Sequence, residues 1–200
     1  MKTSIKTLLK VSLTAIILSS VIFTSNVYAI KKGIDTKIKT SAFKRIYVKG
    51  NIEITIIQGG GYGISYPDDD MGAAKVAQNG YDLKITSTGT EKAKLTVYVN
   101  DFYRIEASEN AIVKTEGKLN TKYLQIFLRG NAQAEINTSS EGLYTVISDH
   151  ADLKLSGSTD CHTLVMGKSQ KLTIDKFAAL KTNISSTETV ALEQELAAIK

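Results

Sequence analysis

The sequence predicts an all-β fold built as a parallel β-helix, and three observations lead to this prediction. A 13-residue frame recurs at spacings of 18–21 residues, with an upstream copy at 44 and later starts at 103, 124, 143, 162 and 180. Apolar and polar residues alternate on both sides of a short break in each frame, which is typical of strands with one buried face. The break itself consists mainly of turn-forming residues.

Two positions of the frame contain only apolar residues. The fifth position holds Val48, Ala107, Leu128, Ile147, Met166 and Ile184. The eleventh position holds Ile54, Val113, Ala134, Leu153, Leu172 and Val190. Because like residues recur at like positions, we expect each strand to pair with its equivalent one coil away, about 4.8 Å distant, and the apolar side chains to form continuous columns.

The seventh and eighth positions explain the break. They hold Gly50-Asn51, Glu109-Asn110, Gly130-Asn131, Asp149-His150, Lys168-Ser169 and Ser186-Thr187. Gly, Asn, Asp and Ser accept left-handed backbone or bond to their own main chain in turns. The break is therefore predicted to be a corner, and the residue after it, Ala111, Ala132 or Ala151, suits a crowded inward position.

A β-sandwich is the competing all-β architecture. Its turns are typically about 8–12 residues apart, so a constant frame of 18–21 residues favours the coil. One unit cannot bury its apolar face alone, and successive units must stack. Stacking also places Lys114, Glu135 and Lys154 above one another on the outer surface, with opposite charges adjacent. Such neighbours contribute on the order of a few tenths of a kcal/mol each.

Residues 57–102 depart from the frame. We expect a polar bend with a helical turn near residues 71–77, and hairpin-like strands at 81–87 and 93–99 at the N-terminal end of the stack. The tail, residues 188–200, suits either a last strand or a short helix. We expect it to cover the C-terminal end, since an uncovered end exposes both core and strand edges.

Residues 1–29 read as a secretory signal peptide. Lys2, Lys6 and Lys10 precede an apolar run of 13 residues, and small and polar residues end at Ala29. A helix that spans a bilayer needs roughly 20 residues, so cleavage is favoured over an uncleaved membrane anchor. We expect an N-terminal extension at 30–42, a β-helix domain at 43–192 and a tail or cap at 193–200.

Charge and cysteine content restrict the function further. Without the signal, the 25 basic and 20 acidic side chains of the full chain become 22 and 20. With this small excess and no Lys/Arg cluster interleaved with aromatics, we expect no nucleic-acid partner. Cys161 is the only cysteine, so no internal disulfide can form. Stability must come from a core, and the remaining length of about 170 residues is enough for one domain.

Several segments resemble a family of exported bacterial proteins. They are FKRIYVKGNIEITIIQG (43–59), NGYDLKI (79–85), AKLTVYVNDFYRIEAS (93–108) and the recurring corners of the GNAQAEI type. In their order they resemble the "putative auto-transporter adhesin, head GIN domain" family over residues 43–192. The resemblance implies a right-handed β-helix at the cell envelope or surface. It supplies no catalytic residue, and Glu109-Asn110 and Asp149-His150 depart from the Ser-Gly-Ser-like corners frequent in the family.

The two histidines and the cysteine are the first candidates for chemistry. His150 takes the corner position that Asn51, Asn110 and Asn131 hold in other units, so we interpret it as a corner residue. His162 is expected at a half-buried wall position. Cys161 and His162 are adjacent on an extended chain and should point to opposite sides, which argues against a nucleophilic pair.

No metal or cofactor site is predicted. Residues 67–70 (PDDD) lack the spaced ligands and closing Glu of a calcium loop. Asp149, His150 and Asp152 form an equally weak cluster. The glycines of 59–63 are not followed by Gly-Lys-Ser/Thr, so they do not form a phosphate loop and are interpreted as a flexible connection.

Polysaccharide cleavage is the enzymatic alternative, because parallel β-helices host such enzymes. It requires carboxylates that converge on one face, whereas the outward acids, Glu53, Glu106, Glu135 and Asp152, are predicted to be scattered. The chain has no tryptophan. An aromatic sugar platform would have to come from tyrosines such as Tyr47, Tyr62, Tyr66 or Tyr144.

The sequence thus predicts an exported, non-catalytic β-helix protein that presents a rigid surface, in the manner of an adhesin. The expected partner is an envelope component, a glycan or a host-surface molecule. The location is the periplasm or the cell surface, and the protein is not integral to the membrane once the signal is cleaved. Polysaccharide binding or cleavage, and a structural envelope module without a ligand, are the alternatives.

Overall fold

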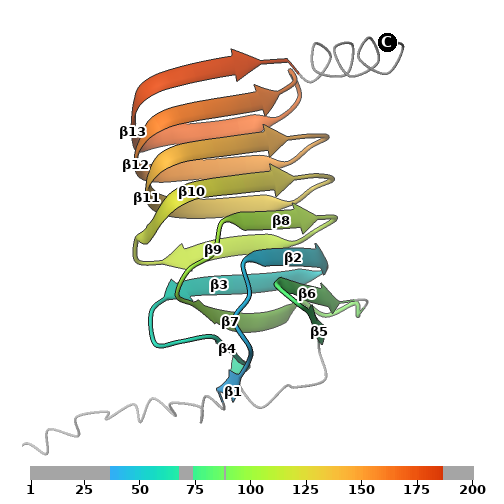
Figure 1. Ribbon diagram of the computed structural model, residues 1–200. Coiled ribbons are helices and arrows are strands. Elements are labelled where there is room, and N and C mark those ends of the chain that lie inside the picture. Colours follow the sequence, from blue (N-terminus) through green and yellow to red (C-terminus); the bar gives the residue numbers. More distant parts are fainter. Residues whose placement is uncertain (1–36, 68–73, 88, 187–200) are drawn as a thin grey trace, which may run out of the picture. The chain divides into compact units, whose positions relative to one another are not determined.

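The computed structural model describes residues 37–67, 74–87 and 89–186. The chain divides into two units, 1–32 and 33–200, and all of the described residues belong to the second. These residues form one sheet of thirteen strands and no α-helix (Figure 1). The strands are β1 Ile38–Lys39, β2 Arg45–Gly50, β3 Ile52–Gln58, β4 Gly63–Ser65, β5 Lys75–Asn79, β6 Asp82–Ser87, β7 Ala93–Val99, β8 Arg104–Ser108, β9 Ile112–Glu116, β10 Leu119–Leu128, β11 Gln133–Ile147, β12 Asp152–Met166 and β13 Lys171–Ser185. The all-β class is confirmed.

The sheet is mixed and curls around its own core (Figure 1). Strands of successive coils pair in parallel, as β8, β10, β11, β12 and β13 do, whereas β1–β4, β4–β7 and β5–β6 pair antiparallel. Alternation along each strand decides which side chains enter the core. In β3, for example, Ile52, Ile54 and Ile56 are fully buried, while the residues between them are partly exposed.

The predicted columns form in register. Leu128 pairs with Ile147, and Ile147 pairs with Met166. The eleventh position likewise stacks, in the order Ile54, Val113, Ala134, Leu153 and Leu172. Parallel pairing of equal positions lets like side chains from neighbouring coils pack in one continuous core.

Four of the six predicted corners have left-handed backbone at their first residue. Lys168-Ser169 is a bend, and Thr187 of the last predicted corner lies outside the described residues. Gly50, Glu109, Gly130 and Asp149, all at the seventh position, have φ between 59° and 98°. The Asp149 carboxylate accepts a 2.7 Å hydrogen bond from the Gly130 amide one coil below, which supports the left-handed backbone there. The alanines that follow the corners, Ala111, Ala132 and Ala151, are fully buried.

The strands at 82–87 and 93–99 exist, but the predicted hairpin between them is wrong. β6 pairs in parallel with β2, and β7 pairs in parallel with β3. Together β6 and β7 make a further coil below β2 and β3, so the coil of β2 and β3 lies between two coils that follow it in sequence. The antiparallel hairpin at this end is β5–β6, so residues 75–77, predicted as part of a helical turn, lie in a strand instead.

The register of the last coil differs from the prediction by two residues. Ile184 pairs with Leu164, whereas the frame predicts Met166 as its partner. The last two frame starts are 18 residues apart, but paired residues are 19 apart up to Lys154 and 20 apart from Ser156 onward, because β13 contains one extra residue at this step. The frame had placed Leu180 beside His162, whereas Thr182 lies there. A bulge of this kind cannot be seen in the alternation alone, since the inward residues on both sides of it remain plausible.

The outward charge column is confirmed. Glu135 pairs with Lys114 on one side and Lys154 on the other, and the Lys154 ammonium lies 2.8 Å from the Glu135 carboxylate. Lys114 makes its 2.6 Å ion pair with Glu53 on β3.

The predicted signal peptide (1–29) and tail (193–200) lie outside the described residues. Of the predicted extension (30–42), residues 37–42 are described, and β1 in this segment joins the sheet beside β4. Of the predicted domain, 43–192, the described part ends at 186.

Candidate functional site

A cleft lined by tyrosines opens where residues 101–103 meet the first half of β10. Its volume is about 400 Å³ and its lining residues are Asp101, Phe102, Tyr103, Lys122, Tyr123 and Gln125. Tyr103 is 40% exposed and Tyr123 is 58% exposed, whereas Phe102 is buried and anchors the segment in the core. We call these six residues the tyrosine cleft. Solvated aromatic rings beside polar groups are characteristic of ligand-binding surfaces.

Tyr123 lies over bare backbone. Its neighbour on β11 is Gly142, and a Cβ atom at Gly142 would lie 2.8 Å from the Tyr123 Cδ1 atom. The ring therefore occupies the space that a side chain would take. The Lys122 ammonium lies 5.7 Å from the centre of the Tyr123 ring and 3.7 Å from the Glu141 carboxylate.

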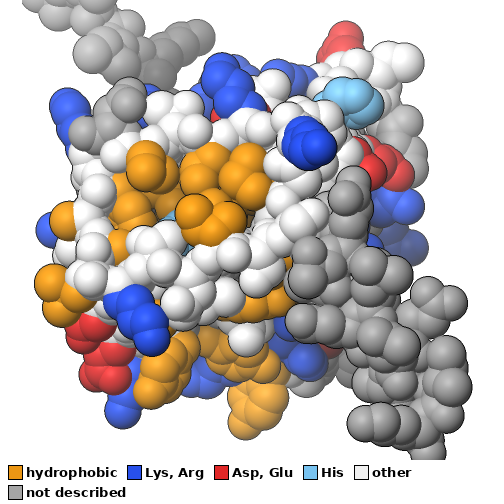
Figure 2. Space-filling model, turned by 90° about the horizontal axis from the view of Figure 1, so that it is seen from above, with side chains coloured by type: hydrophobic (Ala, Val, Ile, Leu, Met, Phe, Trp, Pro, Cys, Tyr) orange, Lys and Arg blue, Asp and Glu red, His pale blue; other side chains and the backbone are white. Residues whose placement is uncertain are grey.

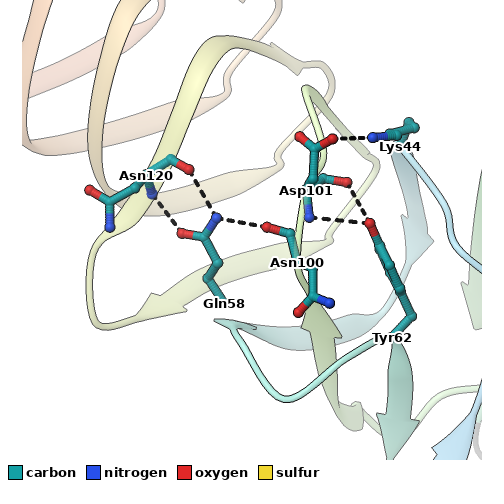
Figure 3. Close-up of polar contacts among 6 residues, drawn as sticks. All are labelled: Lys44, Gln58, Tyr62, Asn100, Asp101 and Asn120. Atoms are coloured by element: carbon teal, nitrogen blue, oxygen red, sulfur yellow. Dashed lines mark hydrogen bonds and ion pairs between the residues drawn. The ribbon is translucent and has the colours of Figure 1, made fainter.

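Hydrogen bonds fix Asp101 from two sides (Figure 3). The Tyr62 hydroxyl donates to the Asp101 carbonyl at 3.1 Å and accepts from the Asp101 amide at 3.2 Å. The Asp101 carboxylate forms an ion pair with Lys44, and this hydrogen bond is the main reason that the pKa of Lys44 is raised. Tyr62 is itself held by an edge contact with buried Phe43, at 5.2 Å between ring centres.

The side chain of Gln58 joins the two segments that line the cleft (Figure 3). Its Nε2 donates to the carbonyls of Asn100 and Asn120, both at 2.9 Å, and its Oε1 accepts from the Asn120 amide at 2.6 Å. The Gly61 amide donates to the Asn100 side chain at 3.1 Å. Because these bonds hold both segments in place, the cleft is preorganised, which lowers the entropy lost on binding.

A second concave surface adjoins the cleft on the outer face of β6, β2 and β8. This groove measures about 380 Å³ and is lined by Tyr47, Val48, Lys49, Asp82, Lys84, Thr86, Glu106, Ala107, Ser108 and Arg129. Its two acids are ion-paired, Asp82 with Arg45 and Glu106 with Arg104 at 3.1 Å. Arg104 also donates to Gln125 of the cleft at 2.8 Å and lies 4.4 Å from the Phe127 ring centre.

The four tyrosines from which a sugar platform would have to come do not lie together. Tyr62 supports Asp101, Tyr66 is buried and its pKa is raised by burial, and Tyr144 packs 5.8 Å from the Phe127 ring centre. Tyr47 lines the groove. The exposed pair, Tyr103 and Tyr123, was missed.

The histidines and the cysteine are not brought together as a catalytic pair. His162 is 3% exposed, deeper than expected, and its Nε2 lies 2.8 Å from the Thr145 hydroxyl. Burial lowers the pKa of His162. Cys161 is partly exposed, with the Asn183 amide 3.9 Å from its sulfur. His150 is an exposed corner residue, as predicted, and its backbone amide donates to Gly130.

The outward acids are each paired with a cation. Glu53 contacts Lys114, Glu106 contacts Arg104, and Glu135 contacts Lys154; Asp152 lies 3.4 Å from Lys171. Hydrogen bonds from the lysines lower the pKa values of Glu53 and Glu135. A general acid of a glycosidase needs the opposite shift. The described residues contain no group of three or more potential metal-binding side chains, and Asp68, Asp69 and Asp70 lie outside them.

Comparisons with known proteins identify the family of this chain. Residues 42–189 match the model of the family "putative auto-transporter adhesin, head GIN domain", and the chain belongs to that family. A "putative adhesin" from Parabacteroides distasonis has 14% sequence identity and a TM-score of 0.55, with 78% of this chain and 79% of that chain covered. A "putative adhesin" from Parabacteroides merdae has 14% identity and a TM-score of 0.52, with 76% of each chain covered.

A third structure, a "putative lipid binding protein" from Parabacteroides distasonis, has 10% identity and a TM-score of 0.53 and covers 75% of this chain and 76% of that chain. At these identities the structures support the fold alone. The comparison with curated proteins found no match. None of the described residues forms a helix with the length and hydrophobicity needed to span a membrane.

Proposed function

We propose that the protein is an exported, non-catalytic binding module of adhesin type, whose ligand contacts Tyr103 and Tyr123. One observation carries the proposal: two solvent-exposed tyrosines line a cleft whose polar groups are already fixed by the Gln58 and Tyr62 hydrogen bonds. Aromatic rings held on a rigid sheet give large contact area at low entropic cost. Family membership supports a surface-binding role.

The proposal includes the finer features of the fold and the location. Parallel pairing from β8 to β13 supports a right-handed parallel β-helix with about 18–21 residues per coil. The composition of residues 1–29 supports a cleaved signal peptide and hence a periplasmic or surface location. The ligand would be an envelope component, a glycan or a host-surface molecule.

A glycan is the ligand class that the cleft favours. Sugar rings present C–H groups on one face, which suit the electron-rich face of tyrosine, and hydroxyls at their edges, which suit Asp101 and Gln125. Cleavage of the glycan, the alternative activity, is not supported by the ion-paired acids described above.

Binding to glycan, envelope and host-matrix arrays, followed by calorimetry, tests the proposal. Tyr123→Ala should weaken binding roughly ten-fold, corresponding to about 1.4 kcal/mol. Tyr81→Ala is the matched control, because Tyr81 is 63% exposed and lies outside the cleft. Absence of any bound class, or equal losses for both variants, would refute the assignment. Release of unsaturated products from uronic-acid polysaccharides with calcium would instead establish cleavage.

A further inference from the structure

The C-terminal end of the described coil stack is open. Among the described residues β13 pairs only with β12, whereas at the opposite end β4 pairs with β7 and β5 pairs with β6. Figure 2 looks onto the β13 end and shows apolar side chains gathered at its centre. Ile174 is 51% exposed, Ile184 is 70% exposed and Leu180 is 86% exposed. A long unpaired edge with apolar side chains is a template for pairing with another strand.

Six residues of β13 point toward the core. Phe177 meets the His162 ring at 5.5 Å between centres, and Ile174, two residues from Leu172, lies on the same face. The other four pair with buried residues of β12: Leu172 with Leu153, Ala179 with Thr159, Thr182 with His162, and Ile184 with Leu164.

These six interior positions are symmetric about Ala178. They form the pairs 172/184, 174/182 and 177/179, each equally far from residue 178. The extra residue that β13 has opposite the step from Lys154 to Ser156 moves the inward positions from even numbers to 177 and 179. They return to even numbers at 182, as they do in β12 between Thr159 and His162. The outward positions are then symmetric as well.

This symmetry has a consequence for pairing. When two identical strands pair antiparallel about a two-fold axis, each residue faces the residue equally far on the other side of the axis. With the axis at Ala178, every interior position faces an interior position, and the two cores become continuous. A shift by one residue would turn apolar side chains toward solvent.

We propose that this end is a dimerisation surface, at which a second copy of the chain pairs its β13 antiparallel with β13 about a two-fold axis at Ala178. Charge is compatible with this register. Lys171, Lys176 and Lys181 would face positions 185, 180 and 175 of the second copy, so no lysine lies opposite another lysine. Lysines on an edge strand often prevent pairing, but they do not oppose this particular arrangement.

Sedimentation of the purified protein over a range of concentrations tests the dimer. We expect a reversible dimer whose dissociation constant rises at least ten-fold in Ile184→Lys, because Ile184 would face Leu172 of the second copy. Ile38→Lys is the matched control, since Ile38 is 44% exposed on β1 at the other end. A protein that stays monomeric, as expected if residues 187–200 cover this end, overturns the proposal. Equal effects of the two variants overturn it as well.

Cysteine cross-linking tests the register directly. In a Cys161→Ser background, Ala178→Cys should form an intermolecular disulfide under mild oxidation, because two-fold related residues of an antiparallel pair have Cα atoms about 4.5–5.5 Å apart. Lys181→Cys should not, because six residues separate the two copies of position 181 along the paired strands, about 20 Å in extended chain. Equal cross-linking at both positions would exclude the proposed axis.

Discussion

The Thr145 hydroxyl and the Nε2 atom of His162 lie 2.8 Å apart inside the coil stack. Both side chains are buried, and burial lowers the pKa of the histidine from its ordinary value of 6.5. A neutral imidazole in contact with a hydroxyl can satisfy one hydrogen bond without introducing charge into the core. The stability of the fold should therefore depend on pH through this residue.

Acidification should destabilise the protein through His162. Below pH 6.5 the unfolded chain binds a proton at this histidine that the folded chain does not. The unfolding free energy therefore falls with decreasing pH until the lowered folded pKa is reached, with a slope of at most about 1.4 kcal/mol per pH unit. Urea unfolding between pH 7.5 and 5 measures the effect. It should diminish in His162→Gln and persist in His150→Gln, whose histidine is exposed; an unchanged slope in His162→Gln would contradict the assignment.

Gly157→Ala should be among the most disruptive single substitutions. Gly157 has φ of 99°, and a Cβ atom there would lie 2.0 Å from the Thr138 carbonyl oxygen of the coil below. We expect the unfolding free energy, measured with urea, to fall by about 3 kcal/mol or more. Gly117→Ala separates backbone strain from steric overlap, because Gly117 has φ of 77° but no atom within 4 Å of the added Cβ. This variant should lower the unfolding free energy by only about 1 kcal/mol. Similar losses for the two variants would show that the close approach is unimportant.

Truncating a buried leucine of the apolar column should lower the unfolding free energy far more than truncating an exposed leucine at the β13 end. Leu128 is fully buried between Ala107 and Ile147, so Leu128→Ala removes packing from three coils and should lose about 2–5 kcal/mol. Leu180→Ala removes the same atoms from a side chain that is 86% exposed and should lose under about 0.5 kcal/mol. Thermal and urea unfolding compare the two, and a small effect at Leu128 would contradict the stacked core.

Gly142→Ala should weaken ligand binding and leave the fold intact. The added methyl group meets the Tyr123 ring at 2.8 Å, and the ring can move because it lies on the surface. Since the backbone at Gly142 does not require positive φ, the unfolding free energy should change by less than about 1 kcal/mol. Calorimetry should show a roughly ten-fold lower affinity for the ligand identified on the arrays. Full affinity in a well-folded variant would exclude Tyr123 from the contact.

The repeating frame predicted much of the fold because stacking repeats the same environment at each level. Leu128, Ile147 and Met166 could be aligned from the sequence, and so could the corner at Asp149. The partners of β6 and β7 could not, because alternation shows which face of a strand is buried and not which strand lies beside it. The register of Ile184 could not be predicted for a related reason. A bulge preserves the local alternation of apolar and polar residues but changes the number of residues between paired positions.

The candidate site was less accessible to sequence reasoning. Tyr103 and Tyr123 belong to different coils, and their shared cleft depends on hydrogen bonds from Gln58 and Tyr62, which lie more than forty residues away in sequence. The Gly142 residue opposite Tyr123 was the one available signal, since a glycine in a strand often marks a close approach. It becomes informative only once the register of β10 and β11 is known.

The position of β2 and β3 between two later coils bears on how the chain acquires its structure. As the polypeptide emerges from its N-terminus, residues 45–58 gain neighbours on one side only when residues 82–99 have followed, and on the other side only when residues 104–116 have followed. Folding cannot then spread coil by coil from the first segment made. Pairing along the first side is complete only when the chain reaches Val99, and the long loop that it closes slows this step.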